Sequence, residues 1–199
     1  YFSYHLGMTG SWSTEKFKHA HLKVDTKQKK SIYFHDIRRF GNIKLISQKD
    51  LEKKYFCEGD FLNFNTDLNT YTNRLHKTIK SGIEVCKILL NQKYFCGVGN
   101  YLKSEILYYA NIHPHTKWQA LEKDDIYNIC KYTQKVIIEA YKKGGAELRD
   151  FKNPDKESKL KLESYGQKQD SKGREIINDI TKDNRRSYWC PEIQIIKTS

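Results

Sequence analysis

The chain has 199 residues, of which 38% are hydrophobic and 13% aromatic, so it can bury a core without a disulfide framework. Its 36 Lys and Arg outnumber its 24 Asp and Glu and give a formal net charge of +12. No apolar run approaches the roughly 18 residues of a membrane span, and the start YFSYHLGMTG lacks a signal-peptide pattern. These features predict a soluble intracellular protein, and the positive charge favours a polyanionic partner, most often nucleic acid.

The cysteines are odd in number, lie far apart and form no C-x-x-C pair. The five are Cys57, Cys86, Cys96, Cys130 and Cys190. Their spacing indicates reduced thiols, and it predicts neither a disulfide framework nor a complete zinc site.

Residues 1–60 have the alternating pattern of β-strands. Leu22 and Val24 alternate with polar neighbours in HLKVDT, and Ile32 and Phe34 share one face of SIYFHD. The polar run TKQKK between these segments is typical of a hairpin turn. We therefore predict a β-domain over 1–60.

Residues 61–78 are polar and weakly periodic, with a short helical end, and we predict a linker there. The helical period begins after this linker and defines a domain over 79–150. From Lys123 to Lys142, apolar residues recur every three or four positions, and Gly144 follows the last of them. This spacing predicts a long helix.

Two shorter helices are predicted ahead of the long one. Apolar residues indicate a helix around Val85–Leu90 and a second around Leu102–Tyr109, and the loop Cys96–Gly99 separates them. Two helices joined by a turn that contains glycine are typical of DNA-binding helical hairpins.

The last segment, 151–199, begins with a charged loop. Two short β-like runs, REIINDI and RSYWC, follow it, and Thr181–Asn184 lies between them, so we predict a hairpin. The predicted fold class is therefore α+β, with strands first, helices next and a C-terminal hairpin.

The loop Gly97-Val98-Gly99-Asn100 precedes a predicted helix. Its backbone N–H groups and the Asn100 side chain are suited to hold a phosphate at the positive end of the helix. In the alternative interpretation, Asn100 only caps the helix. Met8 lies in a turn with glycines on both sides and is suited to wedge into a base stack, although a methionine more often fills a core.

Asp36–Gly41 follows a predicted strand and includes Arg38 and Phe40. Such an arginine can contact a phosphate or a base while the ring stacks on a base. The alternative is a solvated charge next to a core phenylalanine. His19 and His21 lack a third metal ligand nearby, so a metal site is not predicted.

Arg185 and Arg186 lie just before the second strand of the predicted hairpin. A rigid ribbon can present them to a phosphate, or they are ordinary surface charges. Walker, zincin, nucleophile-elbow and dinucleotide motifs are absent from the sequence, so no cofactor is predicted.

Taken together, the order and spacing of these segments resemble the Fpg/Nei family of DNA glycosylases with AP lyase activity. The matching segments are HLGMTGS, KHAHL, DIRRFG, LLNQKYFCGVGNYLKSEILYYANIHP, the helix that ends at KKGG, and the hairpin from SYGQK to RRSYWCPEIQ. Within that family the chain is most similar to the endonuclease VIII-like branch, which removes oxidised pyrimidines.

The resemblance implies a β-sandwich, a helix-two-turn-helix domain and a C-terminal finger, with DNA bound between them. Asn100 would contact the phosphate backbone and His19 would contact DNA. Met8, Arg38 and Phe40 would fill the gap left by an everted nucleotide. Arg185 would hold the phosphates at the lesion and take part in the elimination step.

The chain departs from the family in its finger. The family's zinc-binding cysteines correspond to Lys172, Glu175, Cys190 and Ile193. One cysteine gives little zinc affinity, so we predict a zincless finger held by packing of Tyr188, Trp189 and isoleucines.

A second departure concerns the family's nucleophile, the amine of an N-terminal proline, which is followed by a catalytic Glu and later a Lys. The prolines here are Pro114, Pro154 and Pro191, and the sequence begins Tyr1-Phe2-Ser3. We therefore expect the Schiff-base residues in a segment upstream of these 199 residues, and a natural truncation is the alternative.

The leading hypothesis is a monomeric base-excision-repair enzyme that acts on damaged or abasic double-stranded DNA, in the nucleus or another compartment with DNA. A non-catalytic module that binds damaged DNA is the alternative, and an RNA-binding protein is a weaker one.

Overall fold

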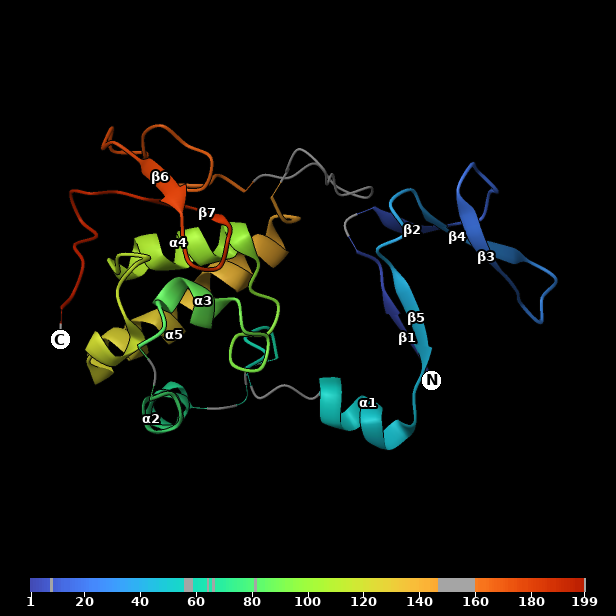
Figure 1. The fold of residues 1–199 in the computed structure, drawn as a ribbon, viewed down its shortest axis with the longest axis horizontal. Helices are drawn as coiled ribbons and strands as arrows, with labels where there is room; N and C mark the ends of the chain where they lie inside the picture. Colours follow the sequence, from blue (N-terminus) through green and yellow to red (C-terminus); the bar gives the residue numbers. More distant parts are fainter. Residues whose placement is uncertain are drawn as a thin grey trace. The chain divides into compact units, whose positions relative to one another are not determined.

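The computed structural model describes residues 1–7, 9–55, 59–63, 65, 67–80, 82–146 and 160–198. The chain forms two compact units, Tyr1–Phe56 and Cys57–Ser199, which are described separately below (Figure 1). Among the helices in these ranges, none combines the length and the apolar character that crossing a membrane requires.

The described residues of the first unit form five strands and one helix. They are β1 (Phe2–His5), β2 (Gly10–Ser13), β3 (Ala20–Asp25), β4 (Ser31–Asp36), β5 (Asn42–Leu45) and α1 (Gln48–Tyr55). β1 pairs with β5, while β2, β4 and β3 form an antiparallel sheet in that order. The predicted β character is therefore confirmed, and α1 is an element that the sequence pattern did not predict. Ser47 starts this helix, because its hydroxyl accepts a hydrogen bond from the Asp50 backbone N–H at 3.1 Å.

The strands β3 and β4 form the predicted hairpin. The Thr26 hydroxyl accepts the Lys30 N–H, and the backbone N–H of Thr26 donates to the Lys30 carbonyl, so the polar run is a tight turn. Phe34 lies opposite both Leu22 and Trp12, in the middle strand of the sheet, and is buried. In this register, Asp36 is the last residue of β4.

The second unit contains the helices. They are α2 (Leu68–Thr78), α3 (Val85–Leu89), α4 (Asn100–Ala110), the 3-10 helix η1 (Trp118–Ala120) and α5 (Lys123–Lys142). The helix predicted over 123–142 is confirmed, as are the two shorter ones. A capping box of Glu122 and Asp125 starts α5, and after α5 Gly144 and Gly145 adopt positive φ.

The linker predicted over 61–78 is instead part of the second unit. Asp67 caps α2 through the Thr70 N–H at 2.8 Å, and Tyr71 and Leu75 face the core, where Phe61 is fully buried. The short helical end predicted there is confirmed as α2, but the polar composition of the segment favoured a linker over a helix that packs on the core.

The main apolar cluster of the helical unit includes Phe95, Ile106, Trp118 and Ile129. The C-terminal strands β6 (Ile177–Ile180) and β7 (Arg186–Trp189) form the predicted hairpin, and β7 packs on α4 (Figure 1). The turn over 181–185 is called the hairpin turn below.

Candidate nucleic-acid interface

In the first unit, two loops meet at the buried carboxylate of Asp36. Its Oδ1 accepts the Thr9 hydroxyl at 2.7 Å, and its Oδ2 accepts the Gly41 N–H at 2.6 Å. The Gly41 N–H and then the Thr9 hydroxyl stabilise the charged form, so the pKa of Asp36 is lowered. Asp36 therefore ties the loop before β2 to the loop after β4.

Gly7 shows how closely these loops approach each other. It has a φ of +64°, and a Cβ added there would lie 3.1 Å from the Phe40 Cβ. Met8 follows Gly7 but falls outside the described residues, so its predicted role stays a prediction.

Phe40 and Arg38 are both exposed on the loop after β4. The Phe40 side chain is 62% exposed, and the Arg38 guanidinium carbon lies 5.5 Å from the centre of its ring. The alternative of a core phenylalanine at this position is therefore wrong. A ring and a cation that face solvent together are free to contact a ligand.

His19 lies in the turn before β3, exposed and with a φ of 68°. His21 differs from His19 because its ring makes a contact within the protein: its Nε2 hydrogen-bonds the Asp36 backbone carbonyl at 2.9 Å. The first unit thus presents His19, Arg38 and Phe40 on loops whose bases are fixed by Asp36.

In the second unit, Gln92 braces the glycine loop before α4. Its Oε1 accepts the Gly97 N–H at 2.9 Å, and its Nε2 donates to the Val98 carbonyl at 3.0 Å. Gly97 has a φ of +79°, which explains why glycine is used there. The sequence analysis did not single out Gln92.

Asn100 is the first residue of α4, and Gly99 occupies the cap position without a side-chain bond. The alternative role of Asn100 as a helix cap is therefore wrong. Its Nδ2 donates instead to the Arg186 carbonyl at 3.0 Å, across 86 residues of sequence. This contact brings the start of α4 to the strand β7.

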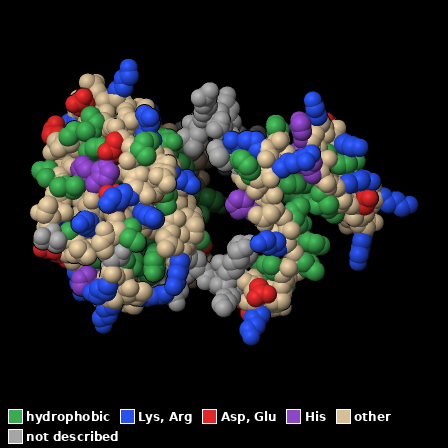
Figure 2. Space-filling view, viewed as in Figure 1, with side chains coloured by type: hydrophobic (Ala, Val, Ile, Leu, Met, Phe, Trp, Pro, Cys, Tyr) green, Lys and Arg blue, Asp and Glu red, His purple; other side chains and the backbone are tan. Residues whose placement is uncertain are grey.

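Arg185 is exposed in the hairpin turn and lines a hollow of about 440 Å³. Lys87 on α3 and Lys182 line the same hollow. Of the residues predicted to bind DNA, the structure thus brings together Asn100 and Arg185 in one unit, with His19, Arg38 and Phe40 in the other. On the side of each unit that Figure 2 shows, Lys and Arg side chains are scattered over the surface, with a few Asp and Glu among them.

Three polar contacts that the sequence analysis missed attach the finger segment to α4. The Lys103 ammonium donates to Asp183, the Glu105 carboxylate accepts the N–H groups of residues 163–165, and the Tyr108 hydroxyl donates to Asp170. The only signal in the sequence was the presence of charged residues in a helix that is otherwise apolar.

Asp170 organises the loop ahead of β6. Its carboxylate accepts the backbone N–H groups of Lys172 and Arg174 and the Arg174 guanidinium at 2.7 Å. Burial opposes its charge, but these hydrogen bonds outweigh burial and lower the pKa of Asp170 to about 2.

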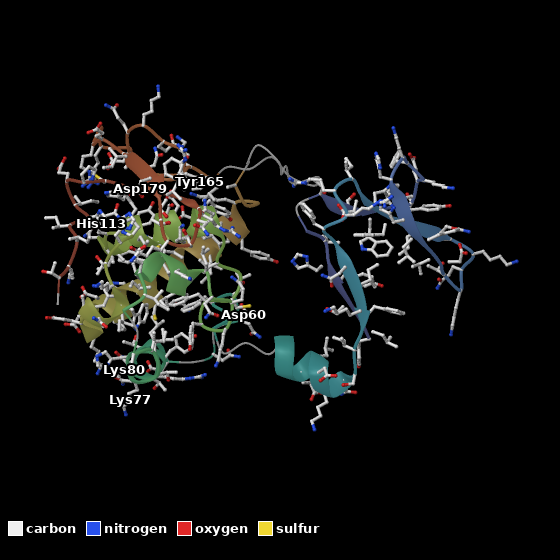
Figure 3. The ribbon with its side chains drawn as sticks, in the orientation of Figure 1. Asp60, Lys77, Lys80, His113, Tyr165 and Asp179 are labelled. Carbon is white, nitrogen blue, oxygen red and sulfur yellow. The ribbon has the colours of Figure 1, made fainter. Side chains whose placement is uncertain are left out.

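His115 joins the hairpin to the loop after α4. Its Nδ1 lies 3.1 Å from a Glu84 oxygen, and its Nε2 lies 2.8 Å from an Asp179 oxygen. Figure 3 labels Asp179 on β6 and the neighbouring His113. Burial lowers the pKa of His115, but the two carboxylates more than compensate and raise it.

The comparisons with known proteins agree along the chain. Residues 1–43 match the formamidopyrimidine-DNA glycosylase N-terminal domain, and residues 63–152 match the formamidopyrimidine-DNA glycosylase H2TH domain. The formamidopyrimidine-DNA glycosylase of Zymomonas mobilis is 31% identical over 203 aligned residues, which cover 96% of this chain and 73% of that protein. The chain belongs to the formamidopyrimidine-DNA glycosylase family.

The names of the matching proteins describe them as DNA glycosylases. The Rickettsia canadensis member is 33% identical over 156 residues, 76% of this chain and 57% of that protein. The chain therefore spans 57% to 73% of the length of these two family members.

Solved structures of the formamidopyrimidine-DNA glycosylase family share the fold. Lactococcus lactis Fpg in complex with abasic-site DNA has a TM-score of 0.78 at 26% identity, over 97% of this chain and 74% of that chain. A mutant of the same protein in complex with Fapy-dG DNA has a TM-score of 0.76. MutM (Fpg) of Thermus thermophilus, at 24% identity, has a TM-score of 0.82 over 99% of this chain and 76% of that chain.

These glycosylases do not support three finer expectations. Their names do not assign the chain to the endonuclease VIII-like branch, and they indicate no preference for oxidised pyrimidines. They also come from bacteria, so they give no support to a nuclear location.

The zinc ion implied by the Fpg/Nei resemblance does not fit the residues of this finger. Lys172 and Glu175 are exposed, and neither offers a thiolate. Cys190 is fully buried in an apolar cluster with Ile176 and Tyr108, against which Ile193 packs. Tyr188 also packs there, as predicted, whereas Trp189 contacts His113, with ring centres 4.9 Å apart.

Proposed function

We propose that the protein is a bifunctional DNA glycosylase and AP lyase of base excision repair. It flips a damaged nucleotide out of the duplex, removes the base and then cleaves the strand by elimination. The observation that carries this proposal is the hydrogen bond from Asn100 to Arg186, because it joins the start of α4 to the turn that bears Arg185.

In this proposal, Asn100 and Arg185 bind the phosphates at the lesion from the second unit. An amide, an exposed guanidinium and the positive end of a helix are all suited to an anion. Arg185 also stabilises charge on the phosphate during elimination. The amine that attacks C1′ in this chemistry is not assigned to any of the three prolines of this chain, Pro114, Pro154 and Pro191.

The first unit occupies the space that the everted nucleotide leaves. Phe40 stacks on the neighbouring base, Arg38 contacts the opposite strand, and Met8 fills the gap with them. His19 contacts the backbone. The exposure of the Phe40 ring next to the Arg38 guanidinium supports this assignment.

The proposed substrates are oxidised purines, including ring-opened formamidopyrimidines. The names of the matching enzymes and the Fapy-dG in a related complex support purine lesions. Oxidised pyrimidines, the substrates of the endonuclease VIII-like branch, are the second candidate class. Excision from duplexes that carry either 8-oxoguanine or thymine glycol distinguishes the two.

The first experiment is borohydride trapping on a duplex with one abasic site, with the mass of the cross-linked polypeptide as readout. A covalent adduct supports the lyase. Preferential binding of the abasic duplex without an adduct favours the non-catalytic module. Equal affinity for abasic duplex, intact duplex and RNA at one salt concentration contradicts both.

We also propose that the finger needs no zinc. The Asp170 network and the cluster around Cys190 hold it in place of four thiolates. Elemental analysis of the protein, purified without chelators, is expected to find far less than one zinc per chain, and a chelator should leave the melting temperature unchanged. One zinc per chain would contradict this proposal.

A further inference from the structure

Lys103 is an unusual residue for its place in the fold. It lies on α4, one turn after Asn100, and its side chain is fully buried. Its ammonium pairs with the Asp183 carboxylate at 2.7 Å, and the Asp183 side chain is only 4% exposed. A buried ion pair of this kind seldom stabilises a protein more than two apolar side chains would, so stability alone does not explain it.

Asp183 connects Lys103 to the backbone of Arg185. Its second oxygen, Oδ1, accepts the Arg185 backbone N–H at 3.1 Å, while Oδ2 is held by Lys103. The hairpin turn is closed by two further backbone bonds, from Asn184 to the Thr181 carbonyl at 2.9 Å and from Thr181 to the Arg185 carbonyl at 3.1 Å. The backbone of Arg185 is thus tied to α4 through one carboxylate.

α4 bonds the hairpin on both sides of Arg185. Asn100 bonds the Arg186 carbonyl at 3.0 Å, and Lys103 bonds Asp183. Because both side chains leave the same rigid helix, they fix the turn against translation and rotation. A guanidinium that must meet a phosphate together with the Asn100 amide needs this precision, since a shift of about 1 Å is costly at such a site.

We propose that Lys103 is a positioning residue for DNA binding: through Asp183 it holds Arg185 next to Asn100 at the start of α4. This inference rests on the proposed function, since it assumes that Arg185 binds a phosphate. Lys103 itself is buried and does not touch DNA.

A double-mutant cycle tests the proposal. The pair Lys103→Met with Asp183→Asn removes both charges together, so no isolated charge is left buried. Affinity for a duplex with a tetrahydrofuran abasic analogue is measured with Arg185 intact and in the Arg185→Ala background. The double substitution should lower the affinity for this duplex about tenfold when Arg185 is present, and less than about twofold when Arg185 is replaced by alanine. Equal costs in the two backgrounds would overturn the proposal.

A matched control separates positioning from general loosening of the finger. The pair Arg174→Met with Asp170→Asn removes another ion pair of the same segment, at the base of the finger rather than at the turn. It should lower the melting temperature to a similar extent, but its effect on affinity should be the same with or without Arg185. Coupling of this control to Arg185 would also overturn the proposal.

Amide hydrogen exchange without DNA gives an independent test. Protection of the Arg185 amide should fall in the Lys103→Met, Asp183→Asn protein, while protection in α5 is retained. Unchanged protection would exclude the positioning role whether or not the protein binds DNA. Equal affinity of the wild type for abasic and intact duplexes would instead contradict the proposed function, and the exchange result would still decide the role of Lys103.

Discussion

At the scale of single residues, Asn100 carries the most direct prediction. One of its amide protons is used by the Arg186 carbonyl, and the second remains for a phosphate oxygen. Because phosphates carry no sequence information, Asn100→Ala should weaken binding by about tenfold on every duplex tested. Fluorescence anisotropy on several sequences measures this, with Asn128→Ala on α5 as the control. Unchanged affinity would exclude a phosphate contact.

Phe40 is expected to behave differently from Asn100. Since 62% of its side chain is already exposed, Phe40→Ala should cost much less stability than the roughly 3–5 kcal/mol of a core phenylalanine. It should nevertheless reduce the preference for abasic over intact duplex, because only a duplex with a gap accepts the ring. Buried Phe34→Ala is the contrasting variant and should mainly lower stability. A Phe40→Ala protein with an unaltered preference would refute the gap-filling role.

At the scale of elements, α4 is the helix on which the finger is assembled. Lys103, Glu105 and Tyr108 contact three separate parts of the segment after 160, so one helix holds all three parts. In the zincless finger proposed above, charged groups take the place of a metal. The attachment should therefore respond to pH.

His115 determines whether this contribution to stability rises or falls with pH. Its two ring nitrogens face the carboxylates of Glu84 and Asp179, and only an imidazolium can donate to both. Its folded pKa is raised above the ordinary 6.5, so the stabilisation is complete below that value and is lost as pH rises through the folded pKa. The pKa of His113 is lowered, mainly by burial and then by His115, and so acts in the opposite direction.

The test compares thermal unfolding of the wild type and His115→Gln. Between about pH 6 and pH 8, the melting temperature of the wild type should fall by roughly 3 °C more than that of the variant. This difference corresponds to about 1 kcal/mol in the free energy of unfolding. His113→Gln serves as the control and should retain the loss seen in the wild type. Identical pH profiles for the wild type and His115→Gln would show that the contact contributes nothing.

At the scale of the whole molecule, the formal charge of +12 predicts a strong salt dependence of DNA binding. The logarithm of affinity should fall linearly with the logarithm of salt concentration, because phosphate contacts release counterions. Arg185→Ala should reduce the magnitude of that slope by about one, as expected for the loss of one phosphate contact. Lys142→Met on α5 removes a charge without removing a proposed contact and should change the slope less. A slope that Arg185→Ala leaves unaltered would contradict its proposed phosphate contact.

The sequence by itself determined the order of the strand region, the helical region and the C-terminal hairpin. The hairpin of β3 and β4, the helix from Lys123 to Lys142 and the turn after Ile180 follow from local periods and turn residues, which depend on neighbours in the chain. It also indicated the family through short motifs. It did not reveal α1, and it indicated 61–78 as a linker with a short helical end, not as part of the core, because most residues of that segment are polar.

Only the tertiary structure decided which residues act together. Lys103 meets Asp183 across 80 residues, and Asn100 meets Arg186 across 86. Such pairs depend on how β7 packs on α4, and no local pattern encodes that packing. For the same reason the sequence left Asn100 open between a helix cap and a ligand, and Phe40 between core and surface. Burial and long-range hydrogen bonds, which are properties of the folded chain, excluded the cap and the core.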